Sequence, residues 1–316
     1  MIVGILGPGG CGGTFLDWSL QYLSGQQSSW FVKFDPTGSK IVSQSCVNVL
    51  DNPLLKNTAH AHLKTHPNNR SIDTVINIFK SQPSFNLHSF YYVDSIDEGR
   101  KQTTHNQIIS KHSDIKFITY NFTDTDIDII FCLQYEKIFG QKNRIENLKI
   151  SNMTQSISEL PIWEKRELLS LYYPDSIRGQ TVAEKINPTS NLYQLDFVDM
   201  IENLDLTINK IFQYFDISVH EERWKRWQEV YTVWKLKNDL TFFKNLNAIV
   251  QCILDHNFHD LCQYNMSFAK EVVIASRLLY NHNIALKSHG INDLSQDTQQ
   301  WSDIIEENVY HNLTKN

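Results

Sequence analysis

The chain has 316 residues, with 35 acidic and 29 basic side chains and a formal net charge of −6. This balance excludes a protein that coats nucleic acid with a broad basic face, because no surplus of Lys and Arg is present to neutralise phosphates. A hydrophobic share of 41% and an aromatic share of 12% exclude a disordered chain. No apolar run approaches the roughly 18 residues of a membrane span. We therefore expect a soluble globular protein without nucleic-acid or membrane partners.

Its compartment and metal content can be judged from the first residues and the cysteines. The chain starts with a short apolar run that lacks a basic leader and is too short for a signal peptide. Its five cysteines are scattered and form no Cys-x-x-Cys pair. Neither a disulfide framework nor a zinc site fits this pattern. We expect a cytoplasmic protein that binds no metal ion.

The elements predicted in chain order alternate between strands and helices. Residues 1–6 form a short β-branched run, a glycine cluster follows, and leucines recur at helical spacing through residues 14–24. Later strands and helices follow the same criteria, and no convincing strand appears after about residue 220. The further strands are predicted at 30–35, 60–65, 89–93, 115–121 and 191–197, and the helices after 123 and at 204–215, 221–237, 240–256, 267–282 and 295–313.

The glycine cluster between the first strand and the first helix is the most informative stretch. Glycines permit positive φ and let the backbone approach a ligand, so that successive N–H groups can point into one concavity. A helix that begins directly behind such a loop adds its dipole, and together they favour a bound phosphate. The residues expected to bind it are Gly9, Gly10, Cys11, Gly12, Gly13, Thr14 and Phe15.

This loop fits two nucleotide-binding templates. Read as Gly-x-Gly-x-x-Gly from Gly7, it is a dinucleotide-binding loop, and Asp35 ends the next strand near the place of a ribose-binding acid. Read as a P-loop, it has Gly13 where the phosphate-binding lysine belongs. An ordinary ATPase or GTPase is therefore disfavoured, and the loop alone does not separate the remaining alternatives.

Two further segments, together with the loop, resemble the PAPS-dependent sulfotransferase family, where PAPS is 3′-phosphoadenosine 5′-phosphosulfate. Residues 11–16 (CGGTFL) are similar to the family's 5′-phosphosulfate loop, and residues 62–67 (HLKTHP) to its Lys-Thr-His segment. Residues 192–217 look like its later strand and helix. The three segments occur in the family's order and together span roughly residues 1–218.

The alternation of strands and helices predicts an α/β fold with a mostly parallel sheet flanked by helices, and the resemblance implies that this fold is of the P-loop type. The domain at 1–218 would be this sulfotransferase-like core. The helical pattern after about residue 220 predicts that 219–316 is a helical carboxyl-terminal extension packed on it. The implied cofactor is PAPS, with PAP as its product. The implied activity is sulfuryl transfer to a hydroxyl or amine of a small molecule, glycan or peptide. In this chain Lys64 would neutralise charge on the bridging oxygen, and His66 would act as the catalytic base.

The chain also departs from the family's pattern. Gly10 stands where a Lys or Arg usually precedes the loop, and no Arg follows the strand at 115–121 to hold the 3′-phosphate. Acidic residues at 124, 126 and 128 stand there instead, in a pattern typical of a capped first helical turn. Two alternatives therefore stay open: a Rossmann-type NAD(P)-dependent oxidoreductase, and a degenerate, non-catalytic nucleotide-binding or interaction protein.

One later helix carries an aromatic stripe. Trp224, Trp227, Tyr231 and Trp234 recur at helical spacing with basic residues around them. Such a face could bind a nucleotide base or a glycan, but a core-facing amphipathic helix is the commoner reason for the pattern.

Overall fold

A computed structural model gives the fold of the chain. It describes residues 1–8, 10–25, 32–34, 36–37, 40–42, 60–64, 72–82, 86–94, 105–123, 126, 128–130, 132, 186–254, 270 and 273–274. The strands are β1 (Ile2–Pro8), β2 (Val32–Phe34), β3 (Lys40–Val42), β4 (His60–Lys64), β5 (His88–Asp94), β6 (Lys116–Asn121) and β7 (Leu192–Asp196). The helices are α1 (Gly13–Leu23), α2 (Ile72–Lys80), α3 (His105–Lys111), α7 (Phe197–Glu202), α8 (Leu204–Phe215), α9 (Glu221–Lys237), α10 (Thr241–Lys244) and α11 (Leu246–Leu254).

Five strands form one sheet in the order β4-β5-β1-β6-β7, and every neighbouring pair is parallel. β1 therefore occupies the centre, with β5 and β6 on its two sides. This confirms the expected α/β architecture with a parallel sheet flanked by helices. β2 and β3 are not part of this sheet, because they pair with each other in a separate antiparallel hairpin.

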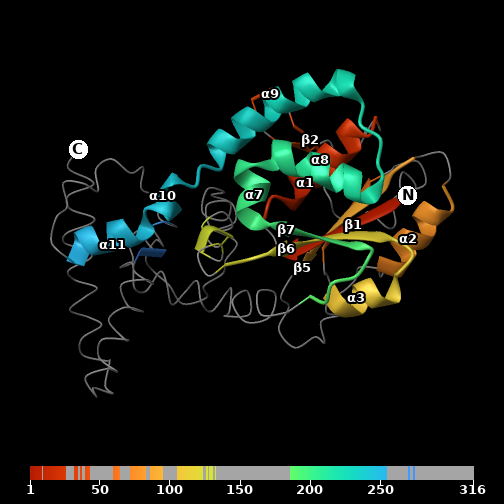
Figure 1. Cartoon of the computed structure of the whole chain (residues 1–316), viewed down its shortest axis with the longest axis horizontal. Helices are drawn as coiled ribbons and strands as arrows, with labels where there is room; N and C mark the ends of the chain where they lie inside the picture. The colour runs from red at the N-terminus through yellow and green to blue at the C-terminus, as the bar shows by residue number, and fades with distance from the viewer. Residues whose placement is uncertain are drawn as a thin grey trace, which may run out of the picture. The chain divides into compact units, whose positions relative to one another are not determined.

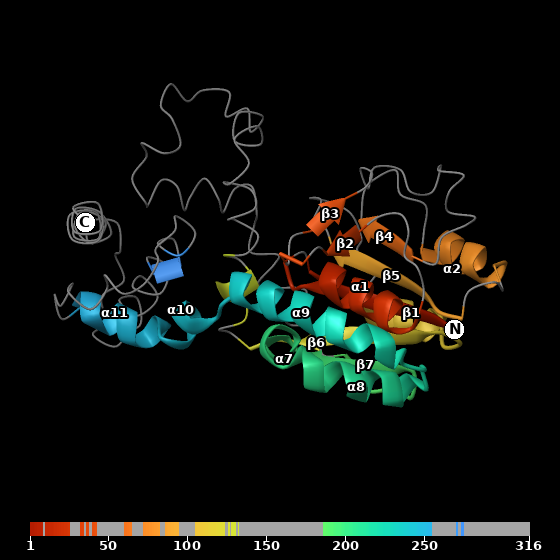
Figure 2. The ribbon, with the colours of Figure 1, turned by 90° about the horizontal axis from the view of Figure 1, so that it is seen from above.

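Helices cover both faces of the parallel sheet (Figure 1). Alternate residues of β1 serve the two faces, as the pleat of a strand requires. Ile2 and Leu6 belong to a buried cluster with residues of α2 and α3, among them Val75 and Ile108. α1 lies on the opposite face, where α9 runs beside it (Figure 2). The sheet is thus the middle of three layers.

The aromatic stripe of α9 packs against α1. Trp227, Tyr231 and Trp234 are at most 8% exposed. The Trp227 indole Nε1–H donates a 2.8 Å hydrogen bond to Ser19 Oγ, and the Trp234 ring stacks on that of Phe15 with centroids 4.2 Å apart. The stripe is therefore a core-facing surface that joins α9 to α1, as its helical period suggested.

The chain divides into two compact units. One comprises Met1–Ile127 and Ser176–Asp239 and contains the parallel sheet, and the other comprises Asp128–Asp175 and Leu240–Asn316. The domain boundary expected at 218–219 stays a prediction. Among the described residues, no helix combines the length and the apolar character that a membrane crossing requires.

Candidate anion site at the carboxyl edge of the sheet

The glycine loop connects the central strand directly to α1. β1 ends at Pro8, Gly10 has φ of 95° and Gly12 has φ of 77°, and α1 begins at Gly13. Both angles are in the left-handed region, which costs a residue with a Cβ energy and suits glycine. The Gly12 carbonyl accepts the first helical hydrogen bonds, from the amides of Phe15 at 2.8 Å and Leu16 at 3.1 Å. The sequence-predicted strand, loop and helix are thus confirmed.

Within the described part of the chain, the backbone N–H groups of Gly12, Gly13 and Thr14 donate to no backbone carbonyl. The first N–H groups of a helix have no partner inside it, and they bind anions readily. Gly10, Gly12 and Thr14 are half-buried, whereas Cys11 and Gly13 are buried. No acidic residue occupies the first turn of α1. The loop therefore keeps a partly solvent-accessible row of donors at the positive end of the helix dipole.

Two of the loop glycines are also required by packing. A Cβ atom at Gly7 would lie 2.7 Å from Cδ2 of Tyr120, and one at Gly13 would overlap the ring of Tyr91. Neither distance is possible without displacing a buried ring. Packing therefore accounts for Gly7 and Gly13, and the residues that point to a ligand are Gly10, Gly12 and Thr14.

Cys11 lies on the sheet side of the loop. Its Sγ is 3.4 Å from the Tyr91 hydroxyl, and the side chain is fully buried. Burial raises the pKa of the Tyr120 phenol well above its usual value, and the neighbouring Cys11 thiol and Asp17 carboxylate raise it further. Tyr120 is therefore a neutral phenol at physiological pH. The sheet side of the loop is closed to solvent, so a ligand must approach from the other side.

The other side of Gly12 faces two helices. A Cβ atom at Gly12 would lie 3.1 Å from Met200 Cε and 3.3 Å from Cη2 of Trp234. Met200 comes from α7 and Trp234 from α9. Gly12 is therefore needed for both its backbone angle and this contact, and the open part of the loop is limited to the neighbourhood of Gly10 and Thr14.

The candidate catalytic lysine lies at the same edge of the sheet as the loop. Lys64 is the last residue of β4; its backbone pairs in register with Val93, and Val93 pairs with Gly7. Two strand spacings place the Lys64 and Gly7 backbones about 10 Å apart. His66 follows two residues later and lies outside the described residues, as do Gly9 and Asp35.

Polar residues at the ends of the other strands were not singled out from the sequence. Asp94 ends β5, in register with Pro8, and Asn121 ends β6, in register with Asp196 at the end of β7. Asn121 Nδ2 donates to Asp196 Oδ1 at 3.1 Å. A polar residue that closes an apolar strand is the signal that could have found them.

A buried carboxyl lies in the segment that follows β6. Asp126 is 2% exposed, and its Oδ2 accepts the Thr123 amide at 2.6 Å. Burial raises the pKa of the Asp126 carboxyl, the hydrogen bonds from Thr123 oppose this rise, and the Asp196 carboxylate adds to it. This part of the edge is acidic, unlike the amide-rich loop beside it. Within the described ranges, no three His, Cys, Asp or Glu side chains gather as metal ligands would.

Comparisons of the chain with protein-family models, curated proteins and solved structures find no match. The structure brings the described loop residues Gly10–Thr14 and the end of β4 to one edge of the sheet. Phe15, the last of the predicted binding residues, is fully buried against Trp234. Its amide also donates to the Gly12 carbonyl, so both the side chain and the N–H group of Phe15 are used within the fold.

Proposed function

We propose that the chain binds the phosphosulfate end of PAPS on the amides of Gly10–Thr14 and transfers the sulfuryl group to a hydroxyl or amine. The observation that carries this proposal is the row of backbone donors at the amino end of α1. These donors lie at the carboxyl edge of a parallel sheet, which is where open α/β sheets bind their ligands.

The transfer would depend on positioning and positive electrostatics. Sulfuryl transfer, like phosphoryl transfer, spreads negative charge over the oxygens of a loose in-line transition state. The loop amides would hold the 5′-phosphate, and Lys64 would stabilise the charge that develops on the bridging oxygen. His66 would accept the proton of the attacking hydroxyl or amine, since an imidazole titrates near pH 7.

The strand order favours this proposal over a Rossmann-type oxidoreductase. In the dinucleotide-binding fold, the second strand lies beside the first and carries the ribose-binding acid near its end. Here the strand that precedes Asp35 is β2, which pairs with β3 outside the parallel sheet. The neighbours of β1 are β5 and β6 instead. The acidic residues Asp196, at the end of β7, and Asp126, in the segment after β6, are the observation that favours the second alternative, a degenerate nucleotide-binding protein without catalytic activity.

Thr14 offers a test that separates binding from folding. We expect Thr14→Asp to keep or raise the melting temperature, because a carboxylate in the first turn of a helix stabilises it by about 0.3–1 kcal/mol. The same charge would repel a bound phosphate and weaken PAP binding at least about tenfold. Gln228→Glu adds an equal charge at an exposed position of α9 and is the matched control.

The measurement is a thermal-shift panel with PAP, NAD, NADP and ATP. At a PAP concentration of 100 times Kd, the wild-type chain should gain about 2.7 kcal/mol of stability. Gln228→Glu should keep this gain, and Thr14→Asp, with an affinity at least about tenfold weaker, should keep no more than about half of it. An unchanged PAP shift in Thr14→Asp would remove the site from the loop. A rise in melting temperature with NAD but not with PAP would favour the alternative of an NAD(P)-dependent oxidoreductase.

A further inference from the structure

Two tyrosines support the glycine loop from the sheet. Tyr91 comes from β5 and Tyr120 from β6, the strands on either side of β1. Their side chains are 3% and 6% exposed. These two strands flank β1, the strand that leads into the loop. The two rings therefore reach the loop from opposite sides of β1.

Each ring packs against the backbone at one end of the loop. Tyr120 leaves no room for a Cβ at Gly7, where β1 enters the loop, and Tyr91 leaves none at Gly13, where α1 begins. A glycine backbone in direct contact with a rigid ring loses much of the freedom that glycine otherwise has. Both ends of the loop are therefore fixed by side chains more than seventy residues away in the sequence.

Cys11 fixes the middle of the loop on the same two rings. Its Sγ lies 3.4 Å from the Tyr91 hydroxyl and 3.2 Å from the position of a Cβ at Gly7, which the Tyr120 ring also borders. Between these fixed points, Gly10 and Gly12 adopt positive φ angles. Converging amides bind an anion well only when they are already in place, because ordering them on binding weakens the affinity.

We propose that Tyr91 and Tyr120 are positioning residues of the anion loop. They touch no ligand; they hold the backbone at Gly7 and Gly13, the two ends of the loop, so that the described amides at 10–14 stay in place. This inference rests on the proposed function, in which the loop binds the donor phosphate. It predicts that loss of either ring makes the loop more mobile and lowers PAP affinity at least about tenfold, even in a chain that remains folded.

A control for ordinary core damage exists on the same strand. Phe90 precedes Tyr91 in β5, is fully buried and faces the other side of the sheet. Its ring leaves no room for a Cβ at Gly4, just as the Tyr91 ring leaves none at Gly13. We expect Phe90→Leu to lower the melting temperature about as much as Tyr91→Leu while leaving the loop unchanged. Tyr91→Phe keeps the ring and should retain nearly the wild-type loop.

The experiment measures backbone ¹⁵N order parameters of residues 10–14 without ligand, and the Kd of PAP. Tyr91→Leu and Tyr120→Leu should lower the order parameters from about 0.85 toward 0.6 and raise Kd, whereas Phe90→Leu should change neither. Should the Leu variants fail to fold, Tyr91→Met replaces the rigid ring by a flexible chain of similar size. Equal order parameters in the Tyr91 and Phe90 variants would overturn the inference. If wild-type protein binds no PAP, the proposed function fails, and the order parameters still decide the role of the tyrosines.

Discussion

Gly25 shows how a single residue connects distant parts of the sheet unit. It follows α1 with φ of 81°, and a Cβ at this position would overlap the imidazole of His220. The His220 amide donates to the Leu23 carbonyl at 2.8 Å, so the end of α1 contacts the residue that precedes α9. Glycine is needed here for its backbone angle and for its lack of a side chain.

Gly25→Ala should therefore lower the free energy of unfolding by about 1–3 kcal/mol, the cost of a strained angle together with local overpacking. Urea denaturation checks the value. The same substitution in a His220→Ala background removes the steric part and should cost only about 1 kcal/mol, which remains from the left-handed angle. Equal stability of Gly25→Ala and wild type would contradict the geometry.

The glycine loop shows what a sequence reveals at the scale of residues. Its place between a strand and a helix was predictable from local pattern, because apolar spacing and glycine clusters are local signals. The separate reasons for each glycine were not predictable. Gly13 is glycine because of Tyr91, and Gly12 because of Met200 and Trp234, contacts that join residues far apart in the sequence.

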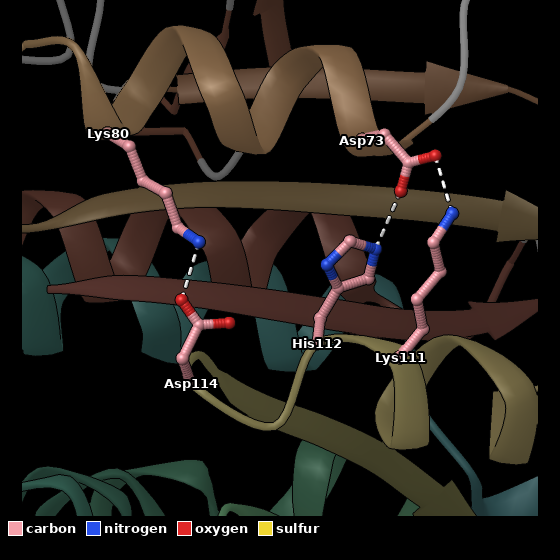
Figure 3. A network of polar contacts seen from close by, with 5 residues as sticks. All are labelled: Asp73, Lys80, Lys111, His112 and Asp114. Atoms are coloured by element: carbon pink, nitrogen blue, oxygen red, sulfur yellow. Dashed lines mark hydrogen bonds and ion pairs between the residues drawn. The ribbon is translucent and has the colours of Figure 1, made fainter.

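Among the elements, helix α2 is joined by ion pairs to the end of α3 and to the turn that follows it, on one face of the sheet (Figure 3). The Asp73 carboxylate of α2 lies 2.6 Å from Lys111 Nζ and 2.9 Å from His112 Nε2. Lys80 Nζ, also of α2, lies 2.5 Å from the Asp114 carboxylate. The Lys111 hydrogen bond holds the pKa of the Asp73 carboxyl below its usual value, partial burial opposes this, and the charges of Lys111 and His112 lower it further.

Asp73→Asn should reduce stability at pH 7 by less than about 1 kcal/mol, since these charges are partly exposed. A carboxyl with a lowered folded pKa stabilises the protein above its unfolded pKa of about 3.9, and this contribution is lost as the pH falls through the folded value. The difference between variant and wild type should therefore vanish near pH 2, and it should shrink in 1 M salt at pH 7. A constant difference across this pH range would argue against the ion pairs.

The predictions of strands and helices are confirmed where the local sequence pattern and the fold favour the same element. The five parallel strands and the helices α1, α8 and α9 lie within a few residues of their predicted positions. Helix α2 was not predicted, because its sequence IDTVINIFK is rich in β-branched residues with low helix propensity. The packing of Val75, Ile76 and Phe79 into the cluster beneath the sheet outweighs that preference. Helix α3 was not predicted for a different reason: its 7 residues include His, Asn and Ser, and so short a helix shows little periodic pattern.

At the scale of the whole sheet unit, parallel strands concentrate chemistry at one edge. All five strands end at the edge that carries the glycine loop, with Lys64, Asp94, Asn121 and Asp196 as the last residues of β4, β5, β6 and β7. A sequence can indicate each strand end, but the strand order that brings them together depends on contacts between distant segments. On one side of β1, the strands β5 and β4 end in Asp94 and Lys64, and on the other side β7 ends in Asp196. Lys64 is therefore the cation among these strand ends, and acidic residues end a strand on both sides of β1.

The polarity of the sheet gives a prediction with an internal control. Lys64 ends β4 at the carboxyl edge, and Lys116 begins β6 at the amino edge. We expect Lys64→Ala to weaken PAP binding about tenfold and to reduce its salt dependence, because a cation near the donor is lost. Lys116→Ala removes the same charge from the same sheet and should leave PAP affinity within about twofold, because most of a strand's length, roughly 3.3 Å per residue, separates it from the loop. Titration of PAP at 50 and 200 mM salt measures both effects. Equal losses in the two variants would mean that the net charge of the protein, rather than the carboxyl edge of the sheet, attracts the nucleotide.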